Sequence, residues 1–507
     1  MALLMERRTS KVRSMLRSLF ILSILVPGFV AALRNRYAAL LMYLWFALFR
    51  PQDWLWIDIT SLRLSMVLGV MLLVPSIATG LLPNMSHPLT VGMALFLTSS
   101  LVSQIGAVRP DIGWMWIDFA ARLLIASMLL VTLTSESRRL VGVVAVIGGS
   151  LGFHAAKAGL AFIVGGGTRF ADGLAGAFVD NNGYALGTVM VLPLLVAAAQ
   201  NVDVLVPTPG LLQTWARRAF YASVPLCFFA VIGTYSRGGF LALSAALFVF
   251  LLLQRRRFTA LAVVSGVLTL LLSVVPIPQR YLDRLSTIGS YDKQVEVDVE
   301  GARESAQSRP HFWKVGIQMG LDRPFGVGLR QYEAAYDRYD FLHGRYGHQR
   351  AVHSSHVQVF AEQGFFGAIV WTGMFAYAFI ACFRVRARSR VEHVSPGHQQ
   401  MLFTIANAMI ASMTAFLVGG AFLALALNDI TWLTFGVVAA LERVSAALVA
   451  EPHVEPVVAA VADHPFQRAP ALEQPDAPAV AAAMPMADVP LAFQAVNSFG
   501  RVNRLPR

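Results

Sequence analysis

Long runs of hydrophobic positions fill most of this chain, and they predict helices that cross a membrane. A helix needs about 20 mainly apolar residues to span a bilayer, and many windows meet this length. With 19–50 taken as one or two crossings, we expect about 12–13 transmembrane helices in an all-α, polytopic membrane bundle. The remaining runs are 62–82, 89–106, 116–133, 140–164, 182–202, 219–236, 238–254, 258–279, 365–383, 402–428 and 429–447.

One long polar stretch, from Arg280 to Gly364, interrupts this pattern and predicts a large loop between two spans. Pro310 suits the first position of a helix, where its missing N–H is not needed. Gly364 suits the left-handed residue that ends one. The loop is therefore expected to be partly helical, with short helices over 309–321, 331–341 and 353–363.

Composition supports a membrane protein. Of the 507 residues, 56% are hydrophobic and 14% are charged, whereas charged residues make up about 25% of a typical soluble protein. The net charge of +12 does not indicate nucleic-acid binding, because the basic residues cluster in short loops, as they do on the cytoplasmic face of membrane proteins. These clusters are Arg7 to Arg17, Arg138-Arg139, Arg217-Arg218, Arg255 to Arg257 and Arg384 to Arg390.

All basic clusters fall on one side of the membrane if 19–50 makes one net crossing. Both termini are then cytoplasmic, and the loop 280–364 is extracytoplasmic. No A-x-A-like cleavage site follows the first apolar segment, so we expect it to be retained. The segments expected on the same side as the loop are 107–115, 165–181 and the hairpin around 235–239.

The chain divides into three predicted parts. Residues 1–18 form a cytoplasmic N-terminus, and 19–450 form the membrane domain with its loop. Residues 451–507 are rich in Ala, Pro and Val without helical periodicity, which predicts a disordered cytoplasmic tail.

Arg237 is the clearest single candidate for a functional residue. It is the one charge within 219–254 and stands between two spans, in Tyr235-Ser236-Arg237-Gly238-Gly239. An arginine at the centre of a membrane helix costs about 2.5–3.5 kcal/mol, and ionisable residues kept there are functional by default. The alternative is an interfacial arginine that binds lipid headgroups.

Arg309 begins a predicted loop helix, where free backbone N–H groups favour anions. Two arginines on one face can hold a diphosphate through bidentate hydrogen bonds. The alternative for Arg309 is a solvated loop arginine.

Four histidines lie within this part of the loop: His343, His348, His353 and His356. His353 and His356 are three apart and share a helix face. No cysteine or H-E-x-x-H partner accompanies them, so no metal site is predicted. A histidine near its ordinary pKa is a suitable general base for an attacking hydroxyl. The alternative is a set of surface histidines.

The glycine-rich segment 165–183 offers further polar groups before an uncharged span. Amide and carboxylate side chains suit hydroxyl-rich ligands such as sugars, and an arginine suits phosphate. The alternative is a helix cap, with Asp180 or Asn181 starting the helix at 183. The residues concerned are Arg169, Asp172, Asp180, Asn181 and Asn182.

In this order, several motifs resemble the O-antigen ligase and polymerase superfamily, over about 19–445. More narrowly, they resemble the O-glycosylation ligases associated with exosortase A systems. The resemblance implies that Arg237, Arg309 and His353 are the functional set. The motifs are RNRYAALLMYLWFALFRPQDW (34–54), VDNNGYALGTVMVLPLL (179–195), GTYSRGGFLAL (233–243), RLSTIGSY (284–291), SRPHFWKVGIQMGLDRPFGVGL (308–329) and VHSSHVQVFAEQGFFG (352–367).

The sequence departs from the family pattern at three positions. Ser354 stands where Asn is common, Ser308 replaces the usual Gly, and Arg169 lacks the Gly-Pro that often follows. These departures affect the substrate more than the type of reaction. Substrate-binding residues are expected at Arg169, Tyr235, Asp180, Asn181, Asn182 and His356.

The resemblance implies a glycosyltransferase of the bacterial inner membrane, with no cofactor and no metal. It would move a glycan from undecaprenyl diphosphate to a hydroxyl of a glycan, lipid or protein, on the periplasmic side. One alternative is a polysaccharide polymerase of the same superfamily. A lipid-linked glycan transporter is another, although it would place charges along a midplane pathway. A membrane scaffold would leave Arg237 unexplained.

Overall fold

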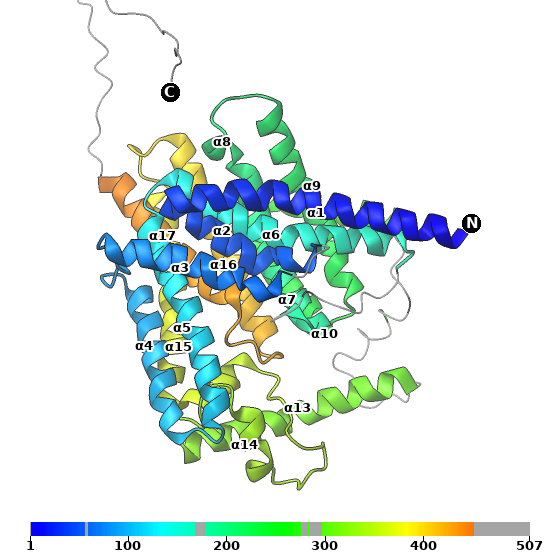
Figure 1. Cartoon of the computed structure of the whole chain (residues 1–507), viewed down its shortest axis with the longest axis vertical. Coiled ribbons are helices and arrows are strands. Elements are labelled where there is room, and N and C mark those ends of the chain that lie inside the picture. Colours follow the sequence, from blue (N-terminus) through cyan, green and yellow to red (C-terminus); the bar gives the residue numbers. More distant parts are fainter. Residues whose placement is uncertain are drawn as a thin grey trace, which may run out of the picture. The chain divides into compact units, whose positions relative to one another are not determined.

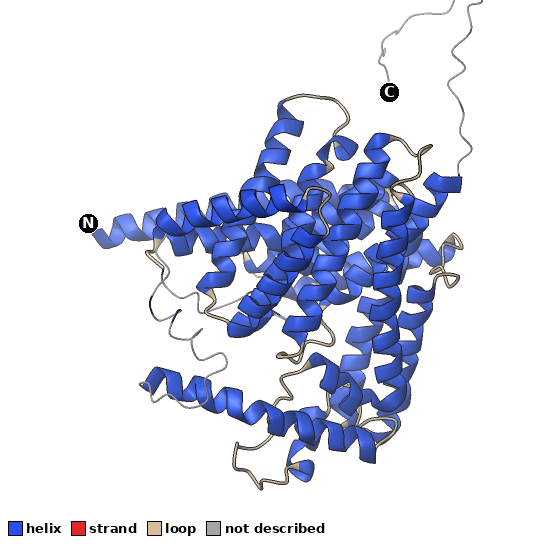
Figure 2. Ribbon diagram, turned by 180° about the vertical axis from the view of Figure 1, so that it is seen from behind, coloured by secondary structure: helices blue, strands red, loops and turns tan. Residues whose placement is uncertain are grey.

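The computed structural model describes residues 2–55, 59–167, 174, 178–274, 279, 282 and 297–450. Its ordered elements are helices, and no strand occurs in the described ranges (Figures 1 and 2). The all-α prediction is therefore confirmed. The predicted tail, 451–507, lies outside the described residues.

Sixteen α-helices are described, joined by short connections and three 3-10 turns at Pro51–Asp53, Thr60–Leu62 and Gln104–Gly106. The helices are α1 (Ala2–Arg34), α2 (Arg36–Phe49), α3 (Leu64–Ala78), α4 (Pro88–Ser103), α5 (Pro110–Leu133), α6 (Ser137–Val164), α7 (Asn181–Gln200), α8 (Val202–Leu205), α9 (Leu211–Gly233), α10 (Arg237–Leu252), α11 (Arg257–Val274), α13 (Val297–Asp322), α14 (Tyr332–Tyr339), α15 (Ser355–Arg388), α16 (Pro396–Gly420) and α17 (Asp429–Ala450).

The described helices fit a polytopic membrane protein. Nine helical segments are long and apolar enough to cross a bilayer. Four more helical segments are apolar but shorter, namely α2, α3, α10 and the first part of α11. The long ones alone are fewer than the predicted 12–13, and the short ones bring the set of apolar helices into that range. An arginine lies at one end of three of the short helices. Arg50 follows α2, Arg63 precedes α3 and Arg237 is the first residue of α10.

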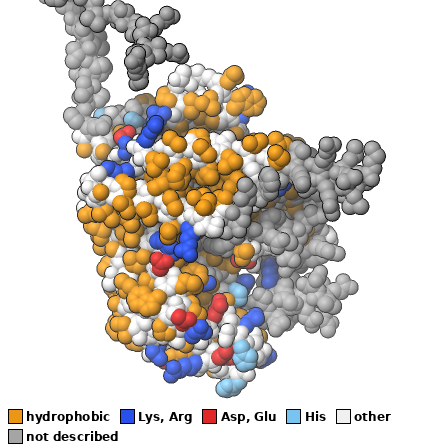
Figure 3. Space-filling view, viewed as in Figure 1, with side chains coloured by type: hydrophobic (Ala, Val, Ile, Leu, Met, Phe, Trp, Pro, Cys, Tyr) orange, Lys and Arg blue, Asp and Glu red, His pale blue; other side chains and the backbone are white. Residues whose placement is uncertain are grey.

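The helices α7 and α16 form the centre of the bundle. In their most apolar windows, 83% and 78% of the residues are buried, compared with 17% in α1. A helix that is hydrophobic on all sides is buried, and these two pack against each other and against α10. Hydrophobic side chains cover much of the face seen over α1 to α5 (Figure 3), as expected for a surface in contact with lipid.

The two ends of the bundle carry different segments. At one end the backbone N–H of Arg109 donates to Gln331 Oε1 at 2.9 Å, which joins the segment before α5 to the polar loop. At the other end Arg138 donates to the carbonyl of Leu205, and Arg386 to that of Leu253. Arg138 of α6 and Arg386 of α15 thus lie at the end opposite to the loop helices α13 and α14 (Figure 1).

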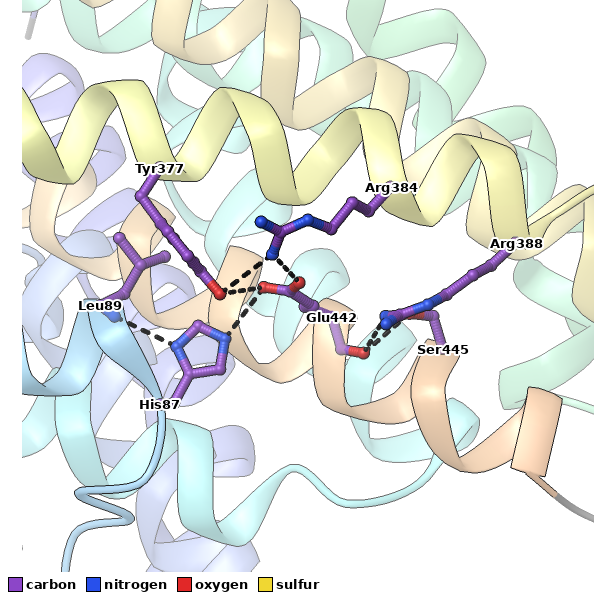
Figure 4. Close-up of polar contacts among 7 residues, drawn as sticks. All are labelled: His87, Leu89, Tyr377, Arg384, Arg388, Glu442 and Ser445. Atoms are coloured by element: carbon purple, nitrogen blue, oxygen red, sulfur yellow. Dashed lines mark hydrogen bonds and ion pairs between the residues drawn. The ribbon is translucent and has the colours of Figure 1, made fainter.

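The buried carboxylate of Glu442 joins three helices at the end of the bundle that carries Arg386. Glu442 of α17 accepts hydrogen bonds from Tyr377 and Arg384 of α15, both at 3.0 Å (Figure 4). His87, at the start of α4, uses Nδ1 to accept from the N–H of Leu89, so its Nε2–H donates to Glu442 at 3.2 Å. Because a buried charge is stable only when it is paired and hydrogen-bonded, this network fixes α4, α15 and α17 relative to one another.

The loop contains the helices that the sequence predicts, with two differences. The helix with Arg309 starts upstream at Val297, so Pro310 lies inside α13 and the prediction that it opens the helix is wrong. Gly364 has the left-handed backbone predicted (φ 66°), but the helix resumes directly and α15 continues to Arg388. The result is a break within α15, where the N–H of Phe365 donates to the carbonyl of Pro324.

We predict that Gly364→Ala destabilises the protein by about 2–4 kcal/mol. A Cβ at Gly364 would stand 1.9 Å from the carbonyl oxygen of Pro324, and φ is in the left-handed region. Gly373→Ala is the matched control, since Gly373 lies in the same helix with no atom within 4 Å of an added Cβ. Thermal unfolding of the purified protein in detergent measures both, and equal midpoints would contradict the prediction.

Candidate active site

Arg237 is positioned by the contact between the first turns of α10 and α7. Ser236 caps α10 by accepting from the N–H of Gly239 at 3.0 Å, and its hydroxyl donates to Asn182 Oδ1 at 2.7 Å. A Cβ on Gly239 would lie 2.6 Å from that of Ala185, so only glycine allows this approach. Arg237 is the first residue of α10 and therefore lies beside the start of α7.

The polar residues at the start of α7 have separate functions. Asp180 is the helix cap, accepting from the N–H groups of Asn182 and Gly183 at 2.8 and 3.0 Å. Asn182 binds Ser236. The Oδ1 of Asn181 is buried, with no hydrogen-bond partner among the described residues. The helix-cap interpretation is therefore confirmed for Asp180, and ligand binding by Asn181 stays a prediction. Arg169 and Asp172 lie outside the described residues.

Arg309 of α13 lies close to Arg237. Burial lowers the pKa of Arg309, and the positive charge of Arg237 lowers it further. Its guanidinium carbon is 5.7 Å from the centre of the Phe422 ring, and the Phe422 Cβ would lie 3.6 Å from a Cβ on Gly238. The Nε of Arg309 is buried without a hydrogen-bond partner among the described residues. Two cations thus share a region with little solvent, which favours binding of an anion between them.

His353 lies at the same place, directly before α15. Its backbone is left-handed (φ 48°), and its ring centre is 5.9 Å from that of Phe312. Burial lowers its pKa to about 4, assisted by Arg309 and Arg350 and opposed by Asp180. The imidazole is therefore neutral at neutral pH and can accept a proton.

The residues after His353 hold the other wall of the site. Ser354 caps α15. The hydroxyl of Ser355 donates to the carbonyl of Leu423 at 2.6 Å and accepts from the N–H of Leu425 at 3.0 Å. Gln358 Oε1 accepts from the N–H of Ala426 at 3.2 Å. These bonds fix the segment that carries Phe422. No sequence pattern indicates a role for Phe422, because its contact with Arg309 joins positions far apart in the chain.

His356 is part of the support rather than of the open site. Trp371 Nε1–H donates to its Nδ1 at 3.2 Å, so its Nε2 carries the proton and donates to the carbonyl of Leu417 at 3.1 Å. Both ring nitrogens are thus used within the protein, and we leave His356 out of the proposed binding set. Tyr235 is also engaged, since its hydroxyl donates to the carbonyl of Gly167 at 2.9 Å.

A small core inside the loop fixes Arg309 and His353 relative to each other. Phe312, Tyr332, Tyr336 and Val352 are buried together, and the hydroxyl of Tyr332 donates to the carbonyl of Phe312 at 2.7 Å. This core joins α13 and α14 to the segment that leads into His353.

A buried hydrogen bond between His311 and Asp340, at one side of the loop core, adds to its rigidity. His311 Nε2 lies 2.8 Å from Asp340 Oδ1. Burial raises the pKa of Asp340, but hydrogen bonds from the N–H groups of Gly344 and Leu342 and from His311 outweigh it and lower that pKa. Asp340 is therefore ionised, and it anchors the turn after α14.

The site belongs to a polytopic helical membrane protein, at the end of the bundle where α7 and α10 meet the loop. Residues 222–372 match the family described as O-Antigen ligase, and this range contains Arg237, Arg309 and His353. Residues 16–197 match a family of unknown function, DUF5935. No curated protein matches the chain. The first match confirms the resemblance to the O-antigen ligase superfamily over this part of the chain, and it supports an O-antigen ligase- or polymerase-like membrane enzyme.

Proposed function

We propose that the protein transfers a glycan from a polyprenyl diphosphate carrier, undecaprenyl diphosphate in particular, to a hydroxyl of an acceptor glycan, lipid or protein. The observation that carries the proposal is the meeting of Arg237, Arg309 and His353 within the matched domain. The narrower likeness to exosortase-associated ligases favours a ligase over a polymerase.

The two arginines would bind the diphosphate and stabilise its charge as it leaves. Burial and, to a smaller extent, the charge of Arg237 lower the pKa of Arg309, and an anion between the two arginines would relieve their repulsion. Fixed donors in a site of low dielectric stabilise developing charge without reorganisation. Arg237 stands at the end of an apolar helix, and the carrier's lipid chain would lie against the bundle beside it.

His353 would remove the proton from the acceptor hydroxyl as the oxygen attacks the anomeric carbon. The bond from that carbon to the diphosphate breaks, and the diphosphate leaves with the electron pair, so the configuration inverts. Diphosphate is a good leaving group, so the step needs no general acid, and the arginines would take the place of a metal. Asn181, with its unpartnered buried oxygen, is proposed to bind a sugar hydroxyl.

Single substitutions test the assignment of the three residues. Arg237→Ala and Arg309→Ala should each lower glycan transfer by about 10²–10³-fold, and His353→Ala by about 10²–10⁴-fold. Arg338→Ala is the control, because Arg338 is an exposed arginine of the same loop. Transfer is measured on membranes with equal amounts of inserted protein, and wild-type rates in all three variants would refute the mechanism.

The pH dependence tests the role of His353 separately. The base must be neutral, so kcat/KM should hold down to about pH 4 and fall below it, as His353 becomes protonated. Arg350→Gln removes one cation that lowers this pKa. The acid limb should therefore move up by about half to one pH unit while the maximum is kept. The Arg338→Gln control should leave the acid limb of the pH profile unchanged. An acid limb that is also unchanged in Arg350→Gln would argue against His353 as the base.

The location of the site is tested with reporters. We propose that the protein lies in the bacterial inner membrane with the site on the periplasmic side, because the basic clusters gather at the opposite end. A periplasm-active reporter inserted in the turn at Gly344–Gly347 should be active. The same reporter inserted at Glu392, between α15 and α16, should be inactive, and the reverse result would invert the topology.

A further inference from the structure

A cavity of about 470 Å³ lies between α2, α3, α5 and the start of α17. It shares no lining residue with the proposed active site, and all of its lining residues except Asp429 fall within the match to the family of unknown function. Cavities of about 300–1,000 Å³ are typical of ligand sites. Its volume thus suits an organic ligand or a segment of a lipid.

Most of this cavity is apolar, and one side opens at the surface of α3. Phe46 and Phe119 line it from within. Met66, Val70 and Val74 also line it, and they are 45%, 51% and 55% exposed. In a protein of this class such exposed aliphatic side chains on an apolar helix face lipid. A hydrocarbon chain could therefore enter from the bilayer.

One end of the cavity is charged. Arg50, Gln52, Arg122 and Asp429 line it. A smaller adjoining cavity shares Gln52 and Arg122 and adds Arg63. Arg122 lies within the apolar span of α5, where keeping an arginine indicates a function. In Figure 3, basic and acidic side chains interrupt the hydrophobic face.

One feature of this end points to a ligand. The Oε1 of Gln52 is buried, with no hydrogen-bond partner among the described residues, and Gln52 lines both cavities. Arg50 ends α2 and Arg63 precedes α3, so the two arginines flank in sequence the segment that bears Gln52.

The charges at this end are nearly balanced. Arg50 pairs with Asp53 at 3.0 Å, and Arg122 pairs with Asp118. Asp429 lies within electrostatic range of Arg50. Arg63 makes no ion pair within the part of the chain that the structure describes. A ligand with one negative and one positive group fits this balance better than one with a net negative charge.

We propose that the cavity binds a zwitterionic phospholipid. Its phosphate would contact Arg63 and Arg122, its ammonium group would lie near Asp429, and an acyl chain would fill the space between Phe46 and Phe119. The proposal is independent of the glycosyl transfer reaction, and its test does not use enzyme activity.

Native mass spectrometry of the full chain, released from nanodiscs of equal phosphatidylethanolamine and phosphatidylglycerol, tests the proposal. The wild type should retain one phosphatidylethanolamine. Arg63→Gln with Arg122→Gln should lower its retention about tenfold. Gly69→Leu should do the same by filling the cavity, since Gly69 lines it and an added Cβ has only Tyr43 nearby, at 3.7 Å. Arg338→Gln is the control and should retain the lipid.

Asp429→Asn tests the headgroup. It removes the proposed partner of the ammonium group, so the preference should shift toward phosphatidylglycerol while one lipid is still retained. Only variants whose thermal midpoint of unfolding equals that of the wild type are compared. The double arginine variant and Gly69→Leu prevent lipid binding in two independent ways. Unchanged retention in both, or a wild type that prefers phosphatidylglycerol, would overturn the proposal.

Discussion

The site depends on two like charges held together where little solvent reaches them. Burial lowers the pKa of Arg309 and the charge of Arg237 lowers it further, so other contacts must offset the cost. The hydroxyl of Ser236 joins α10 to α7, and the ring of Phe422 lies against the guanidinium of Arg309. The fold supplies this support in advance, so an incoming anion meets donors that are already in place.

Burial and nearby positive charge also determine the protonation state of His353. A histidine in solution is partly protonated near neutral pH, but here burial and two nearby cations keep the ring neutral. An anion bound between the arginines would reverse part of that effect, because it cancels the charge that disfavours the imidazolium. Substrate binding would therefore make His353 a stronger base at the moment when a base is needed.

Sequence patterns located the membrane helices and the loop, because hydrophobic runs and turn residues are local signals. They also singled out Arg237, as an isolated charge among apolar residues, and Gly364, as a left-handed residue that ends a helix, whereas the helix resumes after it. The sequence patterns predicted the wrong start for α13, because a proline within a helix cannot be told by sequence from one at the first helical position. The sequence patterns did not show which of His353 and His356 has a ring nitrogen available to a substrate. That distinction rests on Trp371 and Leu417, which occupy the ring nitrogens of His356 from distant parts of the chain.

The network around Glu442 and the region around Arg237 and Arg309 differ in their charge. At Glu442 the carboxylate is surrounded by donors, and the result is a rigid join between helices. At Arg237 and Arg309 two positive charges lie close together, and the charge of Arg237 adds to burial in lowering the pKa of Arg309. Under the proposed function, the diphosphate would bind beside both arginines and offset their repulsion. The sign of the local charge, more than the identity of any one residue, is what would distinguish an anion-binding site from a structural network.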